Sequence, residues 1–270
     1  MATTPESLPV RLWILLVLPL VASTALCAEH EGFTEPFQTL QLTTVVPGQL
    51  ASLDVREGDH VKIGQQLAAL DTATLEATLA IAKAKKNAQG AVSSATALFK
   101  LRQIRVTKLL ALQIEGHARE DEIERALADQ EVAKANLVIA KEEVTVNRLE
   151  YERVKQQIEL HYLRSPINGV VVELHKEVAE IVQKSEDPIL TLVQLDRLRL
   201  TLHLPTPEAL SLHQGDIVQP HCPELDATVE GVIELVSPLT NADSGTVRVK
   251  ILLDNPNDRY RSGVRCTVLF

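Results

Sequence analysis

Aromatic residues are scarce in this sequence, because Phe, Trp and Tyr make up 3% of its 270 residues while apolar residues make up 45%. This combination favours long helices rich in Ala, Leu and Val together with small β-modules, whose cores need no large rings. Basic residues are also few, since 27 Lys and Arg stand against 36 Asp and Glu, and the formal net charge is −9. Binding to nucleic-acid phosphates requires a basic face, so the composition argues against a nucleic-acid partner.

Sulfur-containing residues are rare as well, which limits redox and metal chemistry. Met1 is the only methionine, so a metal site built from thioethers is excluded. Three cysteines occur, at Cys27, Cys222 and Cys266. In an oxidising compartment the last two can form a disulfide, and alternatively both can be small buried apolar side chains. Both interpretations stay open, because the Cα separation that a disulfide requires cannot be read from a sequence.

Sequence signatures of catalysis are missing. None of the eight histidines belongs to the zinc-binding pattern of two histidines at i and i+4 on a helix with a glutamate between them. A Walker-type phosphate loop and a Gly-x-Ser-x-Gly elbow are also absent. The acidic cluster Glu120-Asp121-Glu122 is typical of a solvated helix start. We therefore expect no enzymatic activity, no cofactor and no metal site.

The first 28 residues have the layout of a secretory signal peptide. Arg11 precedes an apolar run, and small residues follow at positions 22–25. We expect cleavage after residue 27 or 28 and export of the mature chain. Two alternatives stay open. One is an uncleaved anchor, although residues 12–28 are short for a membrane-spanning helix. The other is lipidation of Cys27, although Leu26 stands where a lipoprotein signal has a small residue.

Residues 72–160 contain no proline and only two glycines, Gly90 and Gly116, which favours helix. Apolar residues recur there at alternating steps of three and four, as in a coiled coil. In each of two stripes, nine of eleven positions are apolar. The first stripe is Ala77, Ile81, Ala84, Ala88, Ala91, Ala95, Leu98, Arg102, Arg105, Leu109 and Leu112. The second stripe is Ile123, Ala126, Gln130, Ala133, Leu137, Ala140, Val144, Asn147, Tyr151, Val154 and Ile158. Together they predict two antiparallel helices of about 40 residues that turn near Gly116, which is a hairpin about 60 Å long.

The segments on either side of the helical region are β-like and repeat one another. In residues 38–71, apolar residues alternate around turn signals such as Glu57-Gly58-Asp59. Residues 161–195 show the same spacing at an offset of 121 residues, so that Gly169 corresponds to Gly48. Neither segment alone has enough surface to bury a core. We therefore expect the two halves to close on each other, with the helices leaving between them.

Residues 196–270 continue as short alternating strands. Five candidate strands lie at 198–204, 217–221, 228–236, 246–252 and 265–270, and a short helix is expected within 205–213. So many short strands in so short a segment predict a small β-barrel.

These segments resemble a known family. GQLASLDVREGDHVKIGQQLAALD (residues 48–71) and LRSPINGVVV (residues 163–172) resemble the two half-motifs of periplasmic adaptor proteins, also called membrane fusion proteins. LLDNPN (residues 252–257), followed by RSGV (residues 261–264), resembles the end of that family's barrel. The resemblance covers about residues 38–270. It implies an α+β fold: a split lipoyl-like β-sandwich with an inserted antiparallel α-helical hairpin, followed by a small β-barrel.

The resemblance also implies partners and a location. Three or six copies would form a tube in the periplasm, associated with the inner membrane. The tube would join an inner-membrane transporter, either an efflux permease or an ATP-driven exporter, to an outer-membrane channel. In the permease branch the hairpin tip carries Arg, then Leu four residues on, then Ser seven residues further. Arg105, Leu109 and Gly116 fall at this spacing, and glycine lacks the serine hydroxyl. Alternatively, Arg105 is a solvated charge and Leu109 an ordinary seam leucine.

Two further expectations concern departures from the family. Permease-branch members carry a membrane-proximal domain after the barrel, and we expect this chain to lack it. A different kind of function also stays open, namely an envelope scaffold that uses the hairpin as an arm without any transport.

Overall fold

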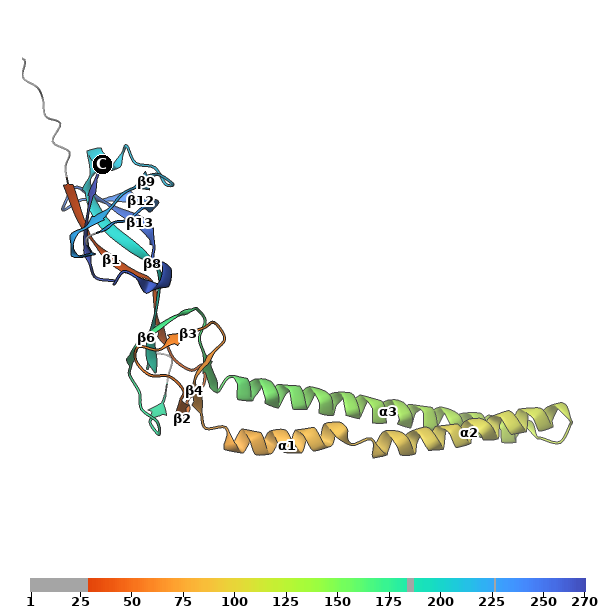
Figure 1. Cartoon of the computed structure of the whole chain (residues 1–270). Helices are drawn as coiled ribbons and strands as arrows, with labels where there is room; N and C mark the ends of the chain where they lie inside the picture. Colours follow the sequence, from red (N-terminus) through yellow and green to blue (C-terminus); the bar gives the residue numbers. More distant parts are fainter. Residues whose placement is uncertain (1–28, 184–186, 226) are drawn as a thin grey trace, which may run out of the picture.

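The structure is a computed structural model that describes residues 29–183, 187–225 and 227–270. The signal-peptide prediction for residues 1–28, with Cys27, lies outside the described residues. Figure 1 shows three bodies one after another: a β-barrel that holds the C-terminus, a smaller β-sandwich, and a helical hairpin that projects from the sandwich. The predicted α+β fold class is confirmed.

Strands of both repeat segments build the sandwich. They are β2 (Gly48–Leu53), β3 (His60–Val61) and β4 (Gln66–Leu70) from the first segment, and β5 (Tyr162–Arg164), β6 (Gly169–Leu174) and β7 (Ile181–Val182) from the second. Antiparallel pairs join β2 to β7, β3 to β6 and β4 to β5. Each strand of the first segment is therefore hydrogen-bonded to a strand of the second, and the shared core includes Leu50 and Leu67 from one and Val171 and Val182 from the other.

The repeat is visible in the backbone as well. Gly58 and Ala179, which are 121 positions apart, both have a left-handed conformation, with φ of 90° and 76°. Glycine adopts this conformation freely, whereas the Cβ of alanine disfavours it. The turn that joins the strands therefore overrides the preference of alanine at the second position.

Two long strands join the sandwich to the barrel. β1 (Glu29–Leu42) and β8 (Leu190–Pro205) pair antiparallel along most of their length. Their register shifts between Pro36 and Gln38, close to where β8 stops pairing with β6 and begins pairing with the barrel. The barrel thus takes in the start of β1, which lies ahead of the first predicted β segment.

Short strands complete the barrel around β8. They are β9 (Ile217–Val218), β10 (His221–Cys222), β11 (Ala227–Thr228), β12 (Gly231–Asn241), β13 (Thr246–Asp254) and β14 (Arg265–Leu269), with α4 (Thr206–Ala209), η1 (Pro223–Leu225) and η2 (Pro256–Asp258) between them. The sheet order is β11-β10-β14-β1-β8-β13-β12-β9. Alternate leucines of β8 from Leu198 to Leu204 are at most 1% exposed. They fill the barrel core, as the period of two in a strand requires.

The hairpin differs from the prediction in its first arm. α3 (Glu120–Glu159) is one helix of 40 residues, but the first arm is divided into α1 (Ala73–Asn87) and α2 (Gly90–Ile114). Ala88 lies between them in an extended conformation. Asn and Gly are both weak helix formers, so Asn87 and Gly90 explain why the arm breaks at this point.

The seam between the arms was predicted correctly for α3 and only in part for the first arm, where Ala95, Arg102 and Leu109 of the predicted stripe are half-buried. All six buried residues of α3 belong to the predicted stripe. In the first arm the buried residues are Ala82 and Val106, whereas Ile81 and Arg105 of the predicted stripe are exposed. In the observed seam, Lys86 of α1 is followed by Val92 of α2, six residues later. An uninterrupted heptad repeat would separate equivalent seam positions by seven residues. The break therefore shifts the coiled-coil phase by one residue.

Candidate docking surface of the helical hairpin

The hairpin tip is a short turn that joins α2 to α3. Gly116 has φ of +78°, and the backbone N–H groups of Gly116 and His117 donate to the carbonyls of Gln113 and Leu112 at 2.9 Å each. These bonds satisfy carbonyl groups that the helix end leaves open. A Cβ at position 116 would meet no atom within 4 Å. The backbone conformation, and not lack of space, therefore favours glycine here.

Acidic residues occupy the first turn of α3, as predicted for a solvated helix start. Glu120, Asp121 and Glu122 are all exposed. A carboxylate oxygen of Glu122 accepts from the backbone N–H of Arg119 at 3.4 Å. Negative charge at a helix N-terminus is stabilising, so this cluster has a structural explanation.

The structure places Arg105 and Leu109 one turn apart on α2, but it buries them to different extents. Leu109 is half-buried in the seam, whereas Arg105 is exposed. Within the described ranges Arg105 makes no hydrogen bond or ion pair. Together with Leu101, Ile104 and Lys108, these two residues line a shallow hollow of about 310 Å³. Arg105 is nine residues from the end of α2, or about 14 Å at 1.5 Å per residue.

Arg102 is a charged residue that does lie in the seam. Its side chain is 35% exposed and donates to a carboxylate oxygen of Asp129 on α3 at 2.9 Å. This ion pair compensates the charge at a seam position and connects α2 to α3. Arg105, which also belongs to the predicted stripe, is exposed, because the observed seam passes through Val106 instead.

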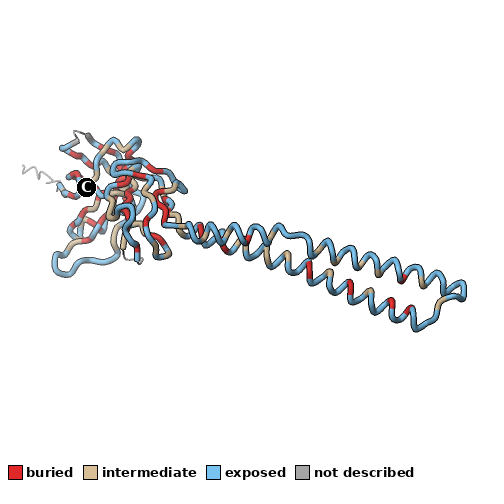
Figure 2. Tube along the Cα trace, turned by 90° about the horizontal axis from the view of Figure 1, so that it is seen from below, coloured by how far each residue is buried: buried red, intermediate tan, exposed pale blue. Residues whose placement is uncertain are grey.

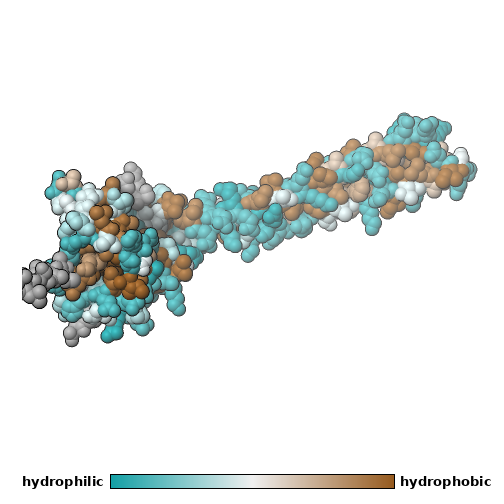
Figure 3. Space-filling view, turned by 90° about the horizontal axis from the view of Figure 1, so that it is seen from above, coloured by the Kyte–Doolittle hydropathy of each residue, from teal (hydrophilic) through white to brown (hydrophobic). Residues whose placement is uncertain are grey.

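A second apolar stripe runs along the outside of α3. Val132, Ile139 and Val146 follow one another at intervals of seven residues, and they are 62%, 59% and 62% exposed. Figure 2 shows that buried residues occur singly along the hairpin, and Figure 3 shows apolar surface along much of its length. This stripe was not predicted, although the sevenfold spacing of its β-branched residues is visible in the sequence. The spacing is that of one position of a coiled-coil heptad.

Several titratable side chains on the hairpin surface pair with a neighbouring side chain. Arg153 donates two hydrogen bonds of 2.8 Å to Glu150, and these bonds lower the pKa of the Glu150 carboxyl below its usual value. Lys86 of α1 lies 4.0 Å from the ring centre of Tyr151 and 3.8 Å from a carboxylate oxygen of Glu152. Lys86 thus connects the first arm to α3, whereas the pair of Arg153 with Glu150 lies within α3. None of these contacts resembles an acid–base pair.

Cys222 and Cys266 meet in the barrel. They lie on the paired strands β10 and β14, with their Cα atoms 4.1 Å apart, and the structure joins them as a disulfide. Both residues are at most 1% exposed and belong to the barrel core. The two interpretations of the sequence, a disulfide or buried apolar residues, are therefore compatible with each other in this geometry.

No group of three or more His, Cys, Asp or Glu side chains is placed to hold a metal ion among residues 29–183, 187–225 and 227–270. No helix in these ranges is both long and apolar enough to cross a membrane.

Comparison with known sequences places this architecture in a family. Residues 38–194, more than half of the chain, match the family described as the RND MFP barrel-sandwich hybrid domain. Multidrug resistance protein MdtE of Escherichia coli K12 is 24% identical over 265 residues, which is 92% of this chain and 64% of MdtE. Multidrug efflux pump subunit AcrA of the same strain is 22% identical over 250 residues, which is 87% of this chain and 60% of AcrA. The chain thus spans less than two thirds of the length of these relatives.

Solved structures show the same fold. MacA from Actinobacillus actinomycetemcomitans matches 90% of this chain and 78% of its own chain, with a TM-score of 0.67 and 21% identity. The membrane fusion protein Spr0693 of Streptococcus pneumoniae R6 matches 89% of this chain and 97% of its own, with a TM-score of 0.57 and 16% identity. Because the family match spans the sandwich and the inserted hairpin, this chain belongs to the membrane fusion protein family of periplasmic adaptors.

Proposed function

We propose that the mature chain is an adaptor subunit of an efflux complex in the periplasm, associated with the inner membrane. In this role it bridges an inner-membrane transporter to an outer-membrane channel. The observation that carries the proposal is the rigid hairpin, which extends about 60 Å along α3 and projects from a compact β-body (Figure 1). The efflux part of the proposal is supported by the similarity to AcrA, named as a multidrug efflux pump subunit, and to MdtE, named as a multidrug resistance protein.

The distal half of α2 is the part of the hairpin best suited to contact the channel. Arg105 is exposed and without a partner in the described structure, and apolar Leu101 and Ile104 lie beside it. A guanidinium group offers five hydrogen-bond donors in a fixed fork. We infer that it binds a carboxylate or a backbone carbonyl of the channel, with the apolar neighbours excluding water.

Arg105→Asp is expected to reduce export without unfolding the protein. The change reverses a charge at an exposed position, so the free energy of unfolding should stay within about 0.5 kcal/mol of its original value. Crosslinking to the outer-membrane channel should fall, because the donors are lost. The measurements are drug export in cells and crosslinking yield from the hairpin.

Lys100→Asp is the matched control for that experiment. Lys100 is an exposed residue of α2, and it lies five positions from Arg105, on a different face of the helix. The charge change is the same, so a general electrostatic effect would appear in both variants.

Gly116→Ser returns the hydroxyl that the family carries. It should raise crosslinking only modestly, since a left-handed backbone disfavours serine by about 1 kcal/mol. Unchanged export and crosslinking in Arg105→Asp would favour the scaffold function.

We further propose that the outer stripe of α3 packs against a second copy of this chain. Val132, Ile139 and Val146 form an exposed seam, and acidic Glu131, Glu142 and Glu143 stand beside it on the same helix. Basic Arg105 and Lys108 stand beside apolar Leu101 and Ile104 on α2. This charge complementarity suits α3 of one copy against α2 of the next, which is a head-to-tail contact that can close into a ring of three or six.

Val132→Glu with Ile139→Glu is expected to weaken self-association at least tenfold. Two buried aliphatic contacts per interface would be lost, each worth about 1.5–3 kcal/mol when fully buried. Sedimentation velocity over a concentration series measures the effect. Val138→Glu is the matched control, because Val138 is 48% exposed and lies on another face of α3. If the control weakens assembly and the double variant does not, the stripe is not the interface.

A further inference from the structure

A cavity lies at the rim of the barrel, away from the hairpin. It has a volume of about 560 Å³ and opens between β11, the paired strands β12 and β13, and the loop around η2. This volume is within the range of pockets that hold drug-sized molecules. None of the hairpin residues discussed above lines it, so the proposed docking function does not use it.

Two carboxylates form one wall of the cavity. Glu230 and Asp254 lie one residue beyond the pair of Gly231 with Leu253 that joins β12 to β13. Both residues are exposed, and neither carboxylate makes a hydrogen bond or ion pair with any residue in the described ranges. Like charges on neighbouring strands repel each other. A bound cation between these carboxylates would relieve that repulsion.

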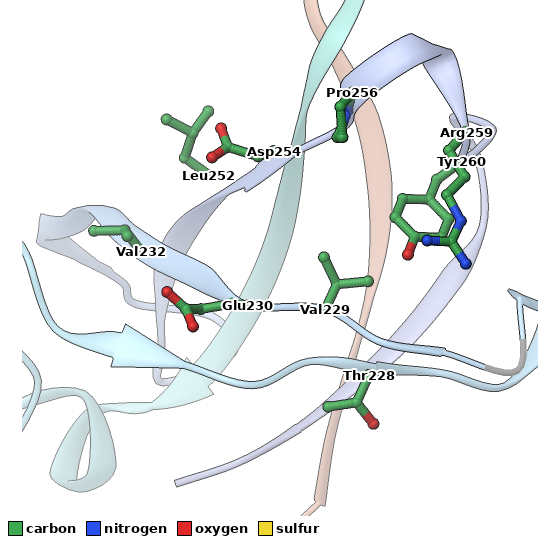
Figure 4. A pocket seen from close by; sticks show the side chains of 9 residues that line it. All are labelled: Thr228, Val229, Glu230, Val232, Leu252, Asp254, Pro256, Arg259 and Tyr260. Carbon is green, nitrogen blue, oxygen red and sulfur yellow. The ribbon is translucent and has the colours of Figure 1, made fainter.

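The remaining walls are apolar and aromatic. Val229 is 9% exposed at the floor, and Figure 4 shows Tyr260 and Arg259 across the cavity from the two carboxylates. The side chain of Asn255 is fully buried and holds the loop in place. Its amide nitrogen donates to the carbonyl of Tyr260 at 2.9 Å, and its amide oxygen accepts from the Tyr260 N–H at 2.7 Å. These bonds hold the backbone that carries Tyr260 in place before any ligand arrives.

We propose that this cavity binds an amphipathic organic cation. The charged nitrogen lies between Glu230 and Asp254, and the apolar body packs against Val229 and Tyr260. Two negative charges and one positive charge, that of Arg259, line the cavity, so the lining favours cations over anions. Arg259 on the opposite side turns the positive end of the ligand toward the carboxylates. The proposal concerns the isolated adaptor and does not rest on its contacts with a transporter or channel.

The test is fluorescence anisotropy with purified mature protein and two dyes of similar size and opposite charge, cationic rhodamine 6G and anionic fluorescein. Rhodamine 6G should bind more tightly than fluorescein. Glu230→Gln with Asp254→Asn keeps the shape of the cavity and should weaken rhodamine 6G binding at least tenfold, because charge-assisted hydrogen bonds are lost. Since the two carboxylates repel each other, the melting temperature of this variant should be equal to or above that of the original protein.

Glu224→Gln with Asp243→Asn is the matched control, since both carboxylates belong to the barrel and neither lines the cavity. This control should bind rhodamine 6G as the original protein does. The proposal is overturned if the original protein does not bind rhodamine 6G. It is also overturned if the Glu230 and Asp254 double variant binds with undiminished affinity, since the dye would then lie on another apolar surface, such as the hairpin. If the control variant loses as much affinity for rhodamine 6G as the Glu230 and Asp254 double variant, the effect comes from net charge alone, and the proposal is overturned as well.

Discussion

Leu137→Pro is expected to abolish export while the β-domains stay folded. Leu137 is half-buried in the seam of α3, midway along the helix. Proline there removes a backbone hydrogen bond and clashes with the preceding turn, which costs about 3 kcal/mol or more. The cores of the sandwich and of the barrel contain no residue of α1, α2 or α3. Hydrogen exchange should therefore show rapid exchange in the hairpin and unchanged protection in the strands.

Glu120→Pro is the matched control for the broken helix. Glu120 is the first residue of α3, where proline is well tolerated because its missing N–H has no partner within the helix. Arg119 before it has φ of −86° and ψ of 151°, which is the conformation that a residue preceding proline prefers. Export should survive this change. Full export in Leu137→Pro would show that the hairpin has no mechanical part in transport.

Removing the disulfide is expected to lower the stability of the barrel by about 4 kcal/mol. The bond closes a loop with a sequence separation of 44 residues, and the chain-entropy relation for that length gives the figure. The loop includes β11, β12 and β13, so the effect should fall on the barrel. For a domain pair of this size, the melting temperature should drop by roughly 10 °C.

Calorimetry of Cys222→Ala with Cys266→Ala measures this loss, and reductant supplies the control. Dithiothreitol should bring the original protein down to the stability of the double variant, and it should leave the variant unchanged. A count of free thiols in unfolded, exported protein should find neither Cys222 nor Cys266 reactive. If both thiols react and dithiothreitol has no effect, the cysteines act only as buried apolar side chains.

The seam positions could be predicted from the sequence much better for α3 than for α1 and α2. The reason is that the buried and exposed faces of α3 differ more clearly in composition. On α3 the buried positions are Ala or larger aliphatic residues, and most of the other positions are polar. On α2, exposed Leu98, Leu101 and Ile104 alternate with seam residues such as Phe99 and Val106. Several phases of the heptad then fit the sequence equally well. Only the contact with α3 selects one of them, and that contact is tertiary.

The β-domains were predictable in kind but not in extent. The split repeat was visible because turn residues mark it twice, and Ala179 shows how the fold enforces the repeat where glycine is missing. The part of β1 from Glu29 to Pro36 was missed, because its strand identity comes from pairing with β8 and β14. The cavity at the barrel rim could not be predicted either. Strand pairing brings Glu230 and Asp254 together, and a loop held by buried Asn255 brings Tyr260 to the same cavity.

The most direct measurement of the central claim is photo-crosslinking in cells from a residue placed near the hairpin tip. Ile114 is 89% exposed at the end of α2, and Val45 is 81% exposed near the sandwich. A photoreactive residue at position 114 should form an adduct with an outer-membrane channel protein, and one at position 45 should not. Adducts at position 114 that contain only other periplasmic proteins, or only copies of this chain, would contradict the bridging function.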